Sequence, residues 1–162
     1  MTGYTEVLQV IGATIIFSLI LTTANRFMLS NTQRQVGTEV EISAVTLAQD
    51  LIEDAKLRAF DQATEGGEIP INIPGDFTAA PFAQTTASSR DMITNFEGFN
   101  GFTETIDTGL GTYTLTAQVE YVEPGNLNQV TNSKTRYKRL IVTITNPSLN
   151  SPISIQYTRT YN

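Results

Sequence analysis

The sequence of 162 residues contains neither cysteine nor histidine. Without cysteine the chain has no disulfide framework and no thiol chemistry. Without histidine it lacks the commonest general base, the commonest metal ligand and the side chain that titrates near neutral pH. The sequence also has no phosphate-binding glycine loop, no calcium-hand spacing and no Gly-x-Ser-x-Gly elbow. These absences argue against an enzyme and predict no cofactor, metal site or catalytic residue.

Charged residues are scarce, at 16% of the chain, where soluble domains usually carry about a quarter. Threonine, asparagine, serine and glutamine are plentiful instead, which favours an exported β-rich protein over a cytosolic enzyme. The scattered acids Asp76, Asp91 and Asp107 have no fixed spacing, and we interpret them as solvated loop carboxylates.

The net charge of −6 is unevenly distributed, because residues 109–162 carry +3 and the remainder carries −9. Five basic residues without interleaved aromatic residues are a weak footprint for nucleic acid, so no nucleic-acid partner is predicted. The simplest interpretation is that they face water; the alternative is that acidic and basic faces complement each other between copies. These residues are Lys134, Arg136, Lys138, Arg139 and Arg159.

Residues 7–25 form an uncharged, mostly apolar run that directly follows Glu6. At about 1.5 Å per helical residue, this run is just long enough to cross a hydrocarbon core. It has no basic segment before it and no small-x-small cleavage site after it, so it is not an ordinary export signal. Arg26 and Arg34 follow the run and would keep the rest of the chain in the cytoplasm, unless a basic leader before Met1 has been removed.

The helical pattern continues beyond this run. Apolar residues recur with helical spacing at Ala44, Leu47, Ala48, Leu51, Ile52, Ala55 and Ala59. No proline occurs between positions 3 and 65, and the pair Gly66-Gly67 predicts the stop. We therefore expect one helix over about residues 3–62, roughly 90 Å long at 1.5 Å per residue. Its first half is apolar nearly all round, so it should protrude and be covered by lipid or by other helices.

The period changes to two in the last fifty residues. The stretches TYTLTAQVEYV, YKRLIVTIT and ISIQYTRTY each alternate apolar and polar residues and predict three antiparallel strands. Residues 63–111 have no sustained period and predict a long connecting loop whose isoleucines and phenylalanines pack on a core. For Phe96, Phe99 and Phe102 we expect packing under the loop, with a surface adhesion patch as the alternative.

The predicted fold is therefore α+β, with a long N-terminal helix packed on a C-terminal antiparallel sheet of three or more strands. We expect a hydrophobic half-helix over residues 1–28 and a globular domain over residues 29–162. The globular domain comprises the amphipathic half-helix 29–62, the connecting loop 63–111 and the sheet 112–162.

This layout resembles the type IV pilin-like superfamily of pilins, minor pilins and pseudopilins. GYTEVLQVIGATIIFSLIL is similar to the pilin N-terminal segment, which has a Phe-Thr-Leu-Ile-Glu-like start and an apolar helix. TLAQDLIEDAKLRAFD resembles an Ala-Gln-x-Leu-(Ile/Leu)-Glu pattern of minor pilins and pseudopilins, and YKRLIVTIT resembles a late strand of the family. The likeness covers the helix and the final fifty residues.

The resemblance implies a subunit of a cell-surface filament. Such a subunit is held in the inner membrane before assembly, loses a short leader, and joins identical subunits in a helical homopolymer with the help of pilus-type machinery. Glu6 would pair with the N-terminal amine of a neighbouring subunit, because a carboxylate in hydrocarbon is tolerated when it is paired. The implied assembly residues are Glu6, Val7, Val10, Ile11, Ile15, Phe17, Leu19 and Leu21.

The chain departs from the family pattern at its N-terminus. Glu6 is the sixth residue rather than the fifth, unless Met1 is removed and Thr2 becomes the first residue. Thr22 stands where many pilins carry proline. Two other interpretations remain open: a minor pilin, pseudopilin or single-span component of a secretion or uptake machine that forms no long fibres, and a soluble module whose helix completes an oligomeric bundle.

Overall fold

The computed structural model describes residues 3–162, so the expectations about Met1 and Thr2 lie outside the described residues. Helix α1 spans Gly3–Leu57, and the chain divides into one compact unit up to Glu39 and a second from Val40 to Asn162. In the first unit every residue of α1 is exposed except Gly12 and Gly37, which are half-buried.

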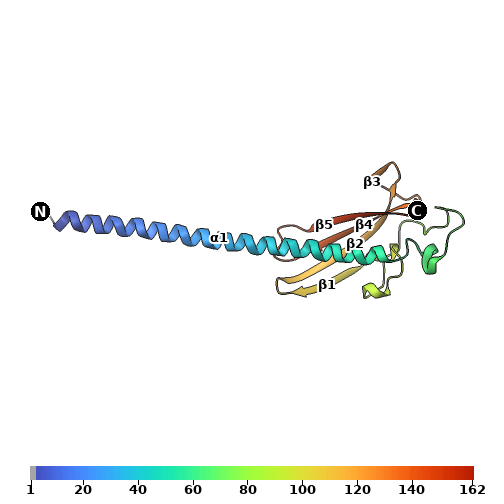
Figure 1. The fold of residues 1–162 in the computed structure, drawn as a ribbon, viewed down its shortest axis with the longest axis horizontal. Helices are drawn as coiled ribbons and strands as arrows, with labels where there is room; N and C mark the ends of the chain where they lie inside the picture. The colour runs from blue at the N-terminus through green and yellow to red at the C-terminus, as the bar shows by residue number, and fades with distance from the viewer. Residues whose placement is uncertain (1–2) are drawn as a thin grey trace. The chain divides into compact units, whose positions relative to one another are not determined.

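The second unit is an antiparallel sheet of five strands with the last part of α1 across one face (Figure 1). The spatial order is β1–β2–β4–β5, with β3 paired to the end of β2. The strands are β1 (Thr103–Thr108), β2 (Gly111–Glu123), β3 (Asn126–Thr131), β4 (Tyr137–Thr145) and β5 (Ile153–Thr160). The predicted α+β class is confirmed, and the three predicted strands correspond to β2, β4 and β5.

The core forms where the apolar stripe of α1 meets the inner face of the sheet. The helix buries Val40, Ala44, Ala48, Leu51, Ile52 and Ala55. The sheet buries alternate residues of two central strands, namely Tyr113, Leu115, Ala117, Val119 and Tyr121 from β2 and Leu140, Val142 and Ile144 from β4. Small helix residues allow a close approach, and the hydroxyl of Tyr113 donates to the carbonyl of Val40 at 3.2 Å.

The helix ends at Leu57, five residues before the predicted end. Ala59 leaves the helical path because its backbone pairs with the loop: its N–H donates to Thr94, and its carbonyl accepts from Phe96. Arg159 of β5 donates to the carbonyls of Ala55 and Arg58 at the helix end, a common way to satisfy the last carbonyls of a helix.

A six-residue 3₁₀ helix, η1 (Gln62–Gly67), follows α1, and Asp61 caps its N-terminus. Both glycines predicted to stop the helix have positive φ, 69° at Gly66 and 85° at Gly67. This backbone conformation favours glycine, so the predicted breaker ends η1 rather than α1.

Residues 63–111 are not a loop throughout. They contain the 3₁₀ helices η2 (Arg90–Met92) and η3 (Glu97–Phe99) and strand β1. β1 gave a weak signal because Ile106 is its only apolar residue, and it lies at the sheet edge. β3 was not among the three predicted strands, and nearly all of it is exposed. Phe96, Phe99 and Phe102 are buried, so they pack under the loop and form no surface patch, whereas Ile69 and Ile71 are exposed.

Candidate functional site

The predicted assembly residues all lie in α1, and all are exposed. Glu6 is in the first turn, where the positive end of the helix dipole favours a carboxylate. Glu6, Val7, Val10 and Ile11 share one shallow surface with Gly3. Leu19 lies on another surface with Ile20, Thr23, Ala24 and Phe27. Ile15, Phe17 and Leu21 are also exposed, so the apolar side chains surround the helix rather than form one stripe.

The hydroxyl groups of this segment bond to the helix itself. Thr14, Thr22 and Thr23 each donate to the carbonyl four residues earlier, at 2.8 Å. These bonds satisfy the donors without water, so the hydroxyls are compatible with an apolar environment. The helix is long and apolar enough to cross a membrane.

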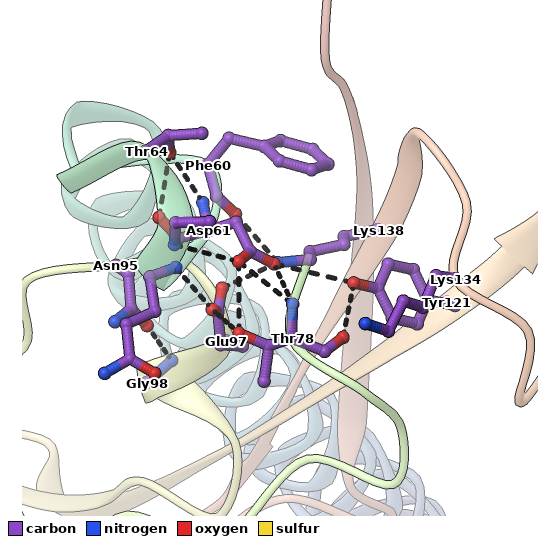
Figure 2. Close-up of polar contacts among 12 residues, drawn as sticks. Phe60, Asp61, Thr64, Thr78, Asn95, Glu97, Gly98, Tyr121, Lys134 and Lys138 are labelled. Atoms are coloured by element: carbon purple, nitrogen blue, oxygen red, sulfur yellow. Dashed lines mark hydrogen bonds and ion pairs between the residues drawn. The ribbon is translucent and has the colours of Figure 1, made fainter. Parts of the chain in front are cut away.

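A second candidate site is polar and lies inside the second unit, where α1 leads into η1. Lys138 of β4 is fully buried, and its Nζ lies 2.6 Å from Asp61 Oδ2 and 2.6 Å from Glu97 Oε2 (Figure 2). The hydroxyl of Thr78 bonds to both acids, and Tyr121 donates to the carbonyl of Thr78 at 2.8 Å. We call Asp61, Thr78, Glu97, Tyr121 and Lys138 the charge cluster.

Burial and charge set the protonation of this cluster. Burial tends to raise the pKa of Asp61, but the charge of Lys138 and hydrogen bonds from Lys138, Ala63 and Thr78 lower that pKa overall. Burial raises the pKa of Tyr121, and the two neighbouring carboxylates raise it further. The carboxyl group of Asp61 is therefore ionised, and it lies beside a neutral phenol.

Sequence reasoning missed this cluster, since it expected the basic residues of the last strands to face water. Lys138 and Arg139 are instead buried, and Arg139 pairs with Glu120. The alternation of β4 held a usable signal: Lys138 has the same parity as Leu140 and Val142, so it lies on the core face. By contrast, Asp76, Asp91 and Asp107 are exposed, as expected, but only Asp76 lies in a loop, because Asp91 is in η2 and Asp107 is in β1.

Arg90 joins the helix to the edge of the sheet. Its guanidinium lies 2.8 Å from Asp50 Oδ2 and 2.8 Å from Asp54 Oδ2 on α1, and 2.6 Å from Glu104 Oε2 on β1. Burial opposes its charge, but the hydrogen bonds that it donates to the three carboxylates raise the pKa of Arg90 overall. Within residues 3–162, no three acidic side chains are arranged to hold a metal ion.

Arg90→Gln is expected to lower the free energy of unfolding by about 1.5–3 kcal/mol, the range for hydrogen bonds to charged groups. The arginine side chain is only 12% exposed, so water screens these bonds weakly. Denaturant unfolding of the full chain in a non-ionic detergent measures the loss. The exposed residue Arg136 provides the control, and a loss no larger than that of Arg136→Gln would contradict a stabilising role.

No family model, curated protein or solved structure matches the chain, and its function therefore has to be inferred from its own residues and their geometry.

Proposed function

We propose that this chain is a structural subunit of an extracellular type IV pilus-like filament, which polymerises through bundled N-terminal hydrophobic helices. The observation that carries the proposal is the exposure of every large apolar side chain among residues 3–39. Apolar surface of this extent is unfavourable in water, so another apolar phase has to cover it. Lipid covers the helix before assembly, and identical helices cover it afterwards.

Glu6 favours other copies of the chain over lipid as the final environment. It is the only charged side chain among residues 3–25. A lone carboxylate in hydrocarbon is costly, but pairing with the N-terminal ammonium of a neighbouring subunit would offset that cost. Because the pair forms only at one axial offset, Glu6 would also fix the register between neighbouring helices.

A second candidate is a single-span component of a secretion or uptake machine, such as a minor pilin or pseudopilin. The length and apolar composition of α1 favour this candidate equally, because such a helix can remain in the membrane. The two candidates differ in whether the chain forms long fibres. The filament proposal requires fibres in sheared surface fractions that contain this chain, and fibres without it would support the second candidate.

Glu6→Gln is expected to abolish filaments or reduce them strongly, because the neutral amide cannot pair with an ammonium. The measurement is the amount of this chain in sheared fibres from the native cells, relative to its amount in the membrane. Protease resistance of residues 40–162 reports whether the second unit remains folded.

Glu39→Gln is the matched control, since Glu39 is an exposed acid of the same helix beyond the uncharged run. Its filament yield should equal that of the wild type. A normal yield from Glu6→Gln would show that the carboxylate has no role in assembly.

A further inference from the structure

The charge cluster places an amine nitrogen against a carboxyl group in a site without water access. Lys138 Nζ lies 2.6 Å from Asp61 Oδ2, and both side chains are 0% exposed. Because a carbonyl C–O bond is about 1.2 Å long, Cγ of Asp61 lies within about 4 Å of Nζ. Reacting atoms in a near-attack arrangement are about 3–3.5 Å apart. A small movement of Nζ therefore brings it to the near-attack distance from the carboxyl carbon.

Aromatic rings enclose this pair. Nζ of Lys138 lies 4.7 Å from the ring centroid of Phe60, 5.2 Å from that of Phe82 and 5.5 Å from that of Tyr121. These rings exclude water from the pair, and their faces also attract the Lys138 ammonium. Because buried charges are costly, the exclusion of water favours a reaction that replaces the two charges with one neutral group and releases water.

Both acids accept hydrogen bonds on the oxygen away from Lys138, but Asp61 accepts more of them. Glu97 Oε1 accepts from the backbone N–H of Gln62 at 2.7 Å and from the hydroxyl of Thr78 at 2.9 Å. Oδ1 of Asp61 accepts bonds from the backbone N–H groups of Ala63 and Thr78 and from the hydroxyl of Thr78, at 3.0–3.1 Å. Such donors stabilise the negative charge that develops on a carboxyl oxygen during nucleophilic attack. Glu97 Oε2 lies 2.6 Å from Nζ, within range for direct proton transfer. Asp61 is therefore the electrophile, and Glu97 is the acid–base group.

We propose that Lys138 and Asp61 condense into an intramolecular amide bond, with Glu97 transferring a proton. The ammonium gives one proton to Glu97, and Glu97 passes that proton to Oδ2 of Asp61, so that the carboxylate becomes a carboxylic acid. The neutral amine then attacks Cγ, which moves an electron pair onto Oδ1, and the nitrogen gives Oδ2 a second proton. The Cγ–Oδ2 bond then breaks, so ammonium and carboxylate yield one amide and one water, and Glu97 returns to its carboxylate form.

This reaction needs no oxidant or cofactor, and it does not rest on the filament proposal. Because the pKa of Asp61 is lowered in the ion-paired state, the proton that Oδ2 needs comes from the ammonium by way of Glu97. The product would join residues 77 positions apart and provide a covalent cross-link in a chain that has no cysteine.

Mass spectrometry of the full chain, purified in detergent, denatured and digested with trypsin, tests the proposal (the cluster is drawn in Figure 2). Trypsin cannot cleave after an acylated lysine. The expected product is a branched peptide in which residues 59–90 are joined to residues 137–139, lighter by one water than the two separate peptides. Fragmentation should place the bond between Asp61 and Lys138.

Two variants separate the roles within the cluster. Lys138→Arg keeps the positive charge but cannot form this amide, so only linear peptides are expected. Glu97→Gln removes the proton acceptor and should also give linear peptides. Complete cleavage after Lys138 in the wild type would overturn the proposal, whether or not either variant folds. A branch to residues 91–134 would overturn the choice of Asp61 as electrophile, and a branch in Glu97→Gln would overturn the role of Glu97.

Discussion

Lys138→Met is expected to lower the free energy of unfolding by at least about 3–5 kcal/mol, the cost of removing one partner from a buried ion pair. The substitution leaves Asp61 and Glu97 buried side by side without the ammonium that both contact at 2.6 Å. It also removes the hydrogen bond to the carbonyl of Phe60 and the proposed amide. Denaturant unfolding of the full chain in detergent measures the loss.

Lys134→Met provides the control, because Lys134 is partly exposed and makes one bond, to the carbonyl of Gly75. Its expected loss is within about 1.5 kcal/mol, the usual limit for a single hydrogen bond. Adding Glu97→Gln to Lys138→Met should restore part of the stability, since one of the two unpaired charges is gone. Equal losses for Lys138→Met and Lys134→Met would show that the charge cluster contributes little.

Leu51→Ala is expected to lower the free energy of unfolding by about 2–5 kcal/mol, through lost apolar burial and the cavity that remains. Leu51 is fully buried between α1 and the sheet. The same substitution at Leu57 is the matched control, because Leu57 is in the same helix but 84% exposed. Its effect should stay within about 0.5 kcal/mol. Similar losses at the two positions would contradict the observed packing of the helix on the sheet.

Much of the fold could be predicted because its main elements have a strong hydrophobic period. Buried and less buried residues alternate along most of β2 and in the second half of β4, and the stripe from Ala44 to Ala55 repeats with helical spacing. β1 and β3 could not be predicted, since an edge strand with one apolar residue and an exposed strand carry almost no pattern. The end of α1 depended on backbone pairing between Ala59 and the distant loop, which local sequence does not encode.

The two candidate sites also differ in how far the local sequence reveals them. The exposed apolar part of α1 could be predicted because its signal is continuous in sequence, from Glu6 through the uncharged run, whereas its role in assembly stays a prediction. The charge cluster could not, because Lys138 is 77 residues from Asp61 and 41 from Glu97. The alternation of β4 places Lys138 on the core face, but no local pattern predicts which acids it contacts there.

The contacts at the end of α1 also bear on the order of folding during synthesis. The hydroxyl of Tyr113 donates to the carbonyl of Val40, Lys138 pairs with Asp61, and Arg159 donates to the carbonyl of Arg58. The partners in these contacts are 73, 77 and 101 residues apart in the sequence. Contacts between residues so far apart in sequence form slowly. The amphipathic part of α1 is therefore made well before the residues that it contacts in the sheet. The second unit can complete its core only after β5 has been synthesised, about a hundred residues after the end of α1.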